Sequence, residues 1–119
     1  MKDFKQLEIW QEAYAFTLEI YQLTKKFPDS ERYGLSSQIR RASTSIISNI
    51  AEGCGRDGDA ELKRFLLIAM GSASEAECQL MLSRDLGYIT STHYDELYTK
   101  LTTFKRRTNA LIQKIKTNT

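Results

Sequence analysis

The chain has 119 residues, of which 41% are hydrophobic and 27% are charged, so we expect one globular domain over residues 1–119 with a modest core. Its formal net charge of +2 is too small to indicate nucleic-acid binding by itself, so only a local clustering of charge can argue for it. One proline and six glycines leave room for long helices, because residues that break helices are scarce.

The first predicted helix covers residues 5–27. Its apolar and small residues alternate four- and three-residue spacings, as on one helix face: Ile9, Ala13, Phe16, Ile20, Leu23 and Phe27. A second stripe beside it contains Trp10, Tyr14, Thr17, Tyr21 and Thr24. Because the remaining polar stripe is narrow, we expect one face to pack inside the domain and a second, carrying Trp10, Tyr14 and Tyr21, to pack partly against another subunit. Pro28 should end the helix near Phe27.

The second predicted helix covers residues 35–54 and is unusual for its many small side chains. Its apolar positions are Leu35, Ile39, Ala42, Ile46, Ile50 and Cys54. Serine, threonine and alanine occupy most of the other positions, which lets another helix approach closely. Gly53 and Gly55 provide the C-terminal stop.

The third predicted helix begins near Asp59, a good N-cap residue, and ends at Gly87, a good C-terminal glycine. Its core stripe is Leu62, Leu66, Ala69, Ala73, Ala76 and Leu80. A second stripe holds Leu67, Met70, Ser74, Cys78 and Met81, so this helix is apolar over a wide arc.

The fourth predicted helix begins where Thr92 and Asp95 resemble a capping box and runs to about Lys116. Its apolar stripe repeats over three heptads: Tyr94, Leu97, Leu101, Phe104, Thr108, Leu111 and Ile115. Four such helices with short connections predict an all-α fold, an antiparallel up-down-up-down four-helix bundle. No segment alternates with period two, so we predict no sheet.

One stretch, Gln38–Arg56, identifies a family. It reads QIRRASTSIISNIAEGCGR and is followed by RFLLIAMGSASEAECQL and LGYI. With these motifs the whole chain resembles the four-helix-bundle proteins known as intervening-sequence proteins of bacterial large-subunit ribosomal RNA. Accessory proteins of diversity-generating retroelements, which work with a reverse transcriptase and its template RNA, share this fold. The resemblance implies a ring-like homopentamer without enzymatic activity. Nucleic-acid binding in such proteins is inferred mainly from gene context and a basic surface.

Paired arginines suggest a polar network between the second and third helices. In a hairpin that turns near Asp57, Arg41 lies level with about residue 73, so acidic residues of the third helix are within reach. Asn49 and Glu52 should clamp the turn between the same helices. The predicted structural network, which connects either two helices or two subunits, is Arg40, Arg41, Asn49, Glu52, Glu75 and Glu77. The alternative for Arg40 and Arg41 is contact with phosphate through their guanidinium groups.

Chemically reactive residues do not cluster in this sequence. Cys54 and Cys78 lie about 27 Å apart along the predicted hairpin, too far for a disulfide, and both are interpreted as small core residues. His93 is the one histidine and is interpreted as a solvated loop residue. No nucleophile, base or metal-binding set converges, so we expect a protein that is not an enzyme and needs no metal or cofactor.

Basic residues collect at one end of the predicted bundle, where the fourth helix ends beside the N-terminus and the turn at residues 53–59. This basic end is a candidate for binding RNA or DNA phosphates with little sequence selectivity, or a nucleoprotein partner. Its candidate residues are Arg56, Lys105, Arg106, Arg107, Lys114 and Lys116. The alternatives are a solvated helix face and an oligomer with a purely structural or protein-interaction role.

The sequence also suggests a compartment. The first residues lack the apolar segment of a signal peptide, and no window approaches 18 apolar residues. Two cysteines outside a C-x-x-C motif fit a reducing environment. We therefore expect a cytoplasmic protein that does not associate with membranes.

Overall fold

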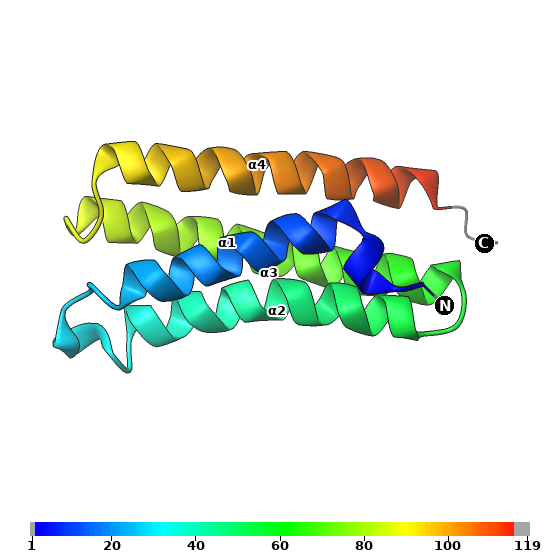
Figure 1. The fold of residues 1–119 in the computed structure, drawn as a ribbon, viewed down its shortest axis with the longest axis horizontal. Coiled ribbons are helices and arrows are strands. Elements are labelled where there is room, and N and C mark those ends of the chain that lie inside the picture. The colour runs from blue at the N-terminus through cyan, green and yellow to red at the C-terminus, as the bar shows by residue number, and fades with distance from the viewer. Residues whose placement is uncertain (1, 116–119) are drawn as a thin grey trace.

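The computed structural model describes residues 2–115, which form four long antiparallel helices and contain no strand (Figure 1). The long helices are α1 (Glu8–Thr24), α2 (Leu35–Gly55), α3 (Asp59–Asp85) and α4 (Ser91–Lys114). Two short 3-10 helices, η1 (Phe4–Gln6) and η2 (Asp29–Glu31), precede α1 and α2. The molecule measures 47 × 24 × 24 Å. The predicted all-α four-helix bundle is confirmed.

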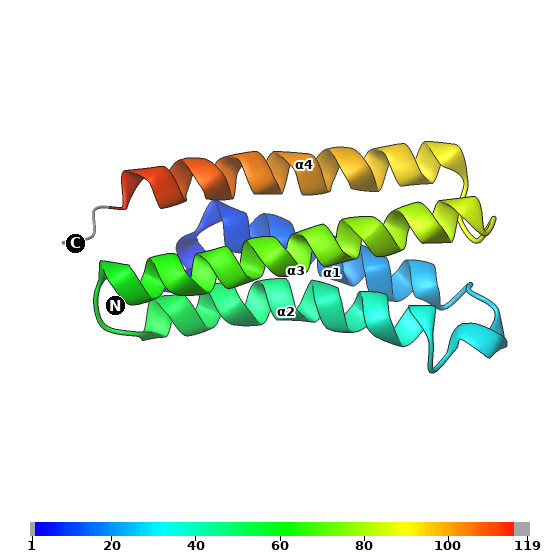
Figure 2. The same cartoon turned by 180° about the vertical axis from the view of Figure 1, so that it is seen from behind.

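The four helices occupy the corners of a square. α1 contacts α2 and α4, and α3 contacts the same two helices, so α1 and α3 lie on opposite corners. The N-terminus, the α2–α3 turn and the end of α4 lie at one end of the bundle; the α1–α2 and α3–α4 connections lie at the other (Figures 1 and 2). This arrangement leaves α1 and α3 with outward faces that point away from one another.

Small side chains bring α2 and α3 into the most extensive helix contact of the bundle. The hydroxyl oxygens of Ser45 on α2 and Ser72 on α3 are 2.8 Å apart. Gly53 approaches α3 so closely that a Cβ atom there would lie 2.8 Å from the Cβ of Phe65. The close packing predicted for the second helix is therefore confirmed.

Two glycines of α2 provide a test of this close contact. Gly53→Ala should lower the free energy of unfolding by about 1–3 kcal/mol, because the added methyl group forces the two backbones apart. Gly55→Ala meets no atom within 4 Å and should instead be neutral or stabilising by up to about 1 kcal/mol. Urea denaturation of both variants measures the difference; equal effects would contradict the contact.

Helix α1 is shorter at both ends than the predicted span of 5–27. At its start, the Asp3 carboxylate accepts a hydrogen bond from the Lys5 amide and caps η1, after which Leu7 is extended. At its end, the amide of Phe27 donates to the carbonyl of Thr24, an i to i+3 bond that tightens the last turn. The side chain of Phe27, immediately before Pro28, is buried in the core and is only 6% exposed.

The ends of α3 and α4 confirm one predicted cap and correct two. Gly87 has φ of +80° and closes α3 as predicted, because its amide and that of Tyr88 donate to carbonyls of the last turn. At the start of α3, however, Gly58 is the N-cap with φ of +86°, and Asp59 is already helical. Thr90 caps α4 by accepting from the His93 amide, so the proposed Thr92–Asp95 capping box was wrong, and His93 lies in the first turn of α4 rather than in a loop.

Candidate functional sites

The outward face of α3 is apolar although it lies at the surface. Leu67, Met81 and Leu82 are 53%, 43% and 48% exposed, and Ile68 is also exposed. We define the α3 outward face as Leu67, Ile68, Gly71, Ser74, Glu75, Cys78, Met81 and Leu82. Between residues 65 and 83, Glu75 is the one exposed charged residue. Cys78, expected in the core, lies on this face and is a free thiol.

Helix α3 is also the one helix of the described chain that is long and apolar enough to span a membrane by length and composition alone. The sequence prediction missed it because alanines, glycine and serines interrupt its larger apolar side chains. In the bundle, Ala69, Ala73 and Ala76 on the inner face have no exposed area. A helix that is apolar all round and covered on one side leaves its other side in need of a partner.

The outward face of α1 carries aromatic and aliphatic side chains. Tyr14 and Leu18 are 43% and 54% exposed, and the half-buried Trp10 stacks on Tyr14 with ring centroids 4.8 Å apart. We define the α1 outward face as Trp10, Tyr14 and Leu18. Thr17 of the same predicted stripe lies inside the bundle, where its hydroxyl contacts the Ala13 and Ser43 carbonyls. Packing of the exposed rings against another subunit stays a prediction.

The proposed pairing of Arg40 and Arg41 with acids of α3 was wrong. Arg40 contacts α1 instead: its Nε donates to Thr24 Oγ1 at 2.7 Å, and its guanidinium lies 4.6 Å from the centre of the Tyr21 ring. Ser45 faces α3, and five residues along a helix turn the side chain by about 140°, so Arg40 points toward the α1 side. Arg41 is exposed and forms no ion pair with another residue of 2–115.

The two acids expected to meet these arginines have other partners. Glu77 pairs with Lys105 of α4 at 2.8 Å, and Glu75 accepts from Gln79 on its own helix at 3.4 Å. The side chain of Glu77 thus connects α3 to α4 rather than to α2. The position of a residue along the hairpin predicts its height on the bundle axis, but not the direction in which its side chain leaves the helix. The predicted pairing rested on the height alone and was therefore wrong.

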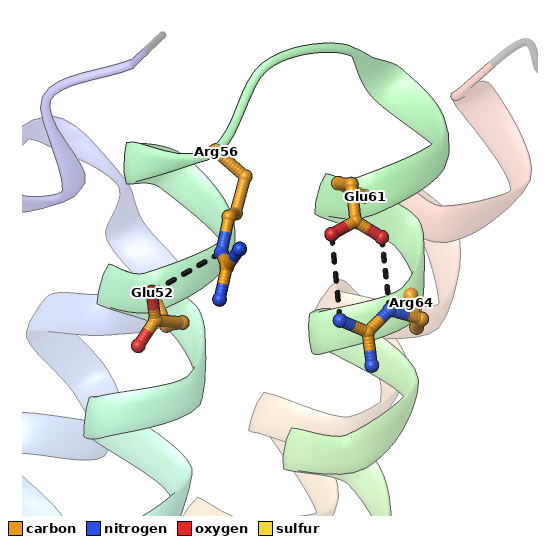
Figure 3. Close-up of polar contacts among 4 residues, drawn as sticks. All are labelled: Glu52, Arg56, Glu61 and Arg64. Atoms are coloured by element: carbon orange, nitrogen blue, oxygen red, sulfur yellow. Dashed lines mark hydrogen bonds and ion pairs between the residues drawn. The ribbon is translucent and has the colours of Figure 1, made fainter.

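The remaining members of the predicted network stay mostly within their own helices. Asn49 donates to the carbonyl and hydroxyl oxygens of Ser45, at 2.8 and 3.0 Å, and reaches α3 only through that serine. Glu52 pairs at 3.3 Å with Arg56, the C-cap residue that follows α2 (Figure 3). Glu61 and Arg64 form a matching pair on α3. Glu52 therefore does not clamp the turn, contrary to expectation.

The basic end combines paired and unpaired cations. Arg56 and Lys105 each pair with a carboxylate, and Arg107 contacts both Glu8 and Glu12 of α1 at 2.9 and 3.2 Å. Arg106 and Lys114 are exposed and form no ion pair with another described residue. Lys116 lies outside the described residues. Pairing within the chain leaves less positive charge for a ligand than the sequence indicates.

A cleft of about 580 Å³, which we call the corner cleft, lies at the opposite end of the bundle, where α1 ends and α2 begins. Its cationic lining residues are Lys25, Arg32, Arg40 and Arg41, and its one carboxylate is Asp29. Its other lining residues are Tyr21, Thr24, Phe27, Pro28, Tyr33, Ser36 and Ser37. Sequence reasoning considered Arg40 and Arg41 as phosphate ligands but missed Lys25 and Arg32, because only the α1–α2 connection brings them to the same place.

Glu31 holds one wall of the corner cleft in place. One of its carboxylate oxygens accepts from the Leu35 amide at 3.1 Å, and the other accepts from the Tyr88 hydroxyl at 2.8 Å. These bonds join the α1–α2 connection to the start of α2 and to the α3–α4 loop. The Tyr88 hydrogen bond, followed by that of Leu35, lowers the pKa of Glu31 below its ordinary value of 4.5.

This lowered pKa predicts how pH acts on the connection. The Glu31 carboxylate binds a proton less readily in the folded protein than in the unfolded chain. Its contribution to the free energy of unfolding is therefore fully present above about pH 4.5 and is lost as pH falls through the folded-state pKa. Glu31→Gln should therefore lower the melting temperature at pH 7, and the deficit should shrink at pH 3. Thermal unfolding of the variant, the wild type and Tyr88→Phe between these values measures it. A deficit that does not change with pH would contradict this role.

The described residues show no group of side chains typical of a metal site. Within 2–115, no three histidine, cysteine, aspartate or glutamate residues are grouped so that they could hold a metal ion. Cys54 is buried and unpaired, and its burial raises the pKa of the thiol, which keeps it protonated and unreactive. As predicted, Cys54 and Cys78 are not joined by a disulfide.

Comparison with known proteins identifies the fold and the family. A crystal structure of a protein of unknown function from the S23 ribosomal protein family of Bacteroides thetaiotaomicron aligns with a TM-score of 0.82 and 27% sequence identity. The alignment covers 88% of this chain and 95% of that one. No curated protein sequence matches the chain. The model of one protein family, described as 23S rRNA-intervening sequence protein, matches residues 5–110. The chain therefore belongs to the 23S rRNA-intervening sequence protein family.

Proposed function

We propose that this protein is a non-enzymatic cytoplasmic scaffold that assembles with copies of itself and needs no cofactor. The observation that carries the proposal is the α3 outward face, a surface stripe with four exposed large apolar side chains and one exposed charge. Fully burying a leucine or methionine side chain contributes about 1.5–3 kcal/mol, so covering the half-exposed residues contributes on the order of 1 kcal/mol each. A second copy is the occupant to which we commit.

The same chain carries a surface that can cover this face. The α1 outward face presents the rings of Trp10 and Tyr14 and the side chain of Leu18, on the opposite corner of the bundle. Contact between the α1 outward face of one copy and the α3 outward face of the next is head-to-tail, and such contacts close into a ring when the rotation permits. The proposed ring contains five copies, the number implied by the resemblance of the sequence.

Light scattering after size exclusion tests self-association at micromolar concentration. We expect a mass close to five times the 13.7 kDa of one chain. A monomer that sediments with phosphatidylcholine vesicles would show instead that lipid covers α3. A monomer that does not sediment with vesicles would overturn the proposal of self-association.

Nucleic-acid binding at the basic end is a second candidate function. It is favoured by Arg106 and Lys114, whose charges no described carboxylate neutralises, and by a family description that refers to 23S rRNA. Assembly into a ring multiplies these charges around an axis. The alternative is an oligomer that serves a structural or protein-interaction role, including one with a nucleoprotein partner, without binding nucleic acid itself.

Salt dependence separates the two possibilities. If phosphates bind here, affinity for a single-stranded RNA should fall steeply with salt, and the double variant Arg106→Gln, Lys114→Gln should reduce the logarithmic slope by about 1.4 per subunit engaged. The double variant Lys100→Gln, Lys105→Gln is the matched control, because these lysines are already engaged by Glu19 and Glu77 and their loss should matter less. If the protein does not bind the RNA at low salt, the remaining possibility is an oligomer with a structural or protein-interaction role.

A further inference from the structure

We propose that the corner cleft between α1 and α2 is a phosphate-binding site that takes the phosphate of a nucleotide, either free or within a single strand of nucleic acid. The site is distinct from the basic end, because its lining residues lie around the α1–α2 connection, which is at the opposite end of the bundle from the end of α4 (Figure 1). It does not depend on self-association or on nucleic-acid binding at the basic end. Its volume of about 580 Å³ lies within the range of small-molecule sites.

The charge balance of the corner cleft is the first argument. Four cationic side chains line it and Asp29 is its one carboxylate. None of Lys25, Arg32, Arg40 and Arg41 forms an ion pair with any residue of 2–115. Elsewhere on the surface, Lys100, Lys105 and Arg107 pair with carboxylates, whereas Lys26, Arg106 and Lys114 pair with none of the described ones, so the distinctive feature of the corner cleft is that four unpaired cations line one cleft. Gathering like charges without partners is unfavourable, and an anionic ligand removes that cost.

Arg40 is held rigidly at the base of the corner cleft. Its Nε donates to Thr24 Oγ1, a hydroxyl that is itself buried, and one Nη donates to the Tyr21 carbonyl at 3.3 Å. The guanidinium also lies over the Tyr21 ring. An arginine has five N–H donors, so several remain for a ligand. Because the side chain is already fixed, binding costs little further conformational entropy.

The start of α2 adds uncharged donors. The hydroxyls of Ser36 and Ser37 line the corner cleft and form no hydrogen bond with another described residue, although Ser36 is only 7% exposed. Their backbone amides, in the first turn of a 21-residue helix, also lack a described acceptor. Backbone amides at a helix start bind phosphate well, and here they supplement the four cations rather than stand alone.

Aromatic side chains favour a nucleotide over inorganic phosphate. Tyr33 is 88% exposed at the rim of the corner cleft, with the Arg32 guanidinium 5.6 Å from its ring centre. Tyr21 also lines the cleft and is 39% exposed, but the Arg40 guanidinium covers one face of its ring. An exposed ring beside a cationic groove can stack on a nucleobase of any kind. The recognised chemistry is therefore a phosphate with a base attached.

Binding of three probes to the full-length protein tests the site. The probes are inorganic phosphate, adenosine monophosphate and a short single-stranded oligouridylate, each titrated at low salt by calorimetry. Arg41→Gln is the primary variant, because Arg41 is exposed and supports no other described side chain. We expect it to weaken nucleotide or strand binding about 5–30-fold, as loss of one charge-assisted bond does. Lys26→Gln, an equal charge change just outside the corner cleft, should leave affinity within about twofold.

Each outcome decides the assignment. Binding of adenosine monophosphate that Arg41→Gln weakens identifies a free nucleotide as a ligand, whereas binding of the strand alone with the same sensitivity identifies a nucleic-acid strand. Equal effects of Arg41→Gln and Lys26→Gln, binding of inorganic phosphate only, or no binding of any probe would overturn the proposal. Light scattering of Arg41→Gln should give the wild-type mass, and Arg106→Gln with Lys114→Gln should leave adenosine monophosphate binding unchanged. These controls separate this site from the proposed assembly and from the basic end.

Discussion

A double variant that carries Leu67→Glu and Leu82→Glu is expected to run as a folded monomer of 13.7 kDa, whereas the wild type is expected to run as the proposed larger assembly. Both leucines are about half exposed on the α3 outward face, so their replacement creates no cavity within a single bundle. In an assembly, by contrast, each carboxylate is buried without a partner, which costs several kcal/mol per contact. Light scattering gives the mass, and circular dichroism verifies the helical content.

The matched control adds the same charge to a different helix. Thr99 and Thr102 are exposed on α4, outside both outward faces. The double variant Thr99→Glu, Thr102→Glu should therefore keep the wild-type mass. If it dissociates the assembly as well, net charge rather than the α3 outward face governs association. If the α3 variant keeps the wild-type mass, α3 is not the interface.

Leu66→Ala is expected to lower the free energy of unfolding by about 3–5 kcal/mol, a large part of the stability of a domain of this size. Leu66 has no exposed area and lies in the core cluster, so truncation removes buried apolar surface and leaves a cavity. Urea denaturation followed by circular dichroism measures the change. Because the site lies inside one chain, the loss should not vary with protein concentration.

The adjacent residue provides the comparison. Leu67→Ala removes the same atoms from a side chain that is 53% exposed, so within one chain it should cost less than about 1 kcal/mol. Any larger loss should come from the assembly and should therefore shrink toward the single-chain value as both proteins are diluted to monomers. A concentration-independent loss equal to that of Leu66→Ala would mean that both leucines belong to the core of a single bundle.

The sequence alone determined the fold class, the number of helices and most of their inner faces. Apolar side chains at three- and four-residue spacing lie on one face of a helix, and that face is buried in the core. Positions such as Ile39, Leu66 and Leu101 could therefore be assigned to the core without coordinates. Gly87 was also predictable, because a positive φ at the end of a helix favours glycine. Family membership followed from the motifs around Gln38–Arg56.

Only the tertiary structure decided which polar side chains meet. Arg40 was expected to reach α3 and contacts α1, because the direction of a side chain around its helix depends on how the helices are arranged. The same holds for Lys105 and Arg107, whose basic character in the sequence is offset by carboxylates from α3 and α1.

The two features that now matter most for function divide in the same way. The sequence showed that α3 is apolar over a wide arc, but it did not show which part of that arc stays uncovered when α2 and α4 have packed against it. Likewise, the motif around Gln38–Arg56 named the family, whereas the corner cleft at Arg40 and Arg41 exists only because the α1–α2 connection brings Lys25 and Arg32 beside them. Local spacing fixes which residues share a helix face, and long-range packing fixes what each face touches.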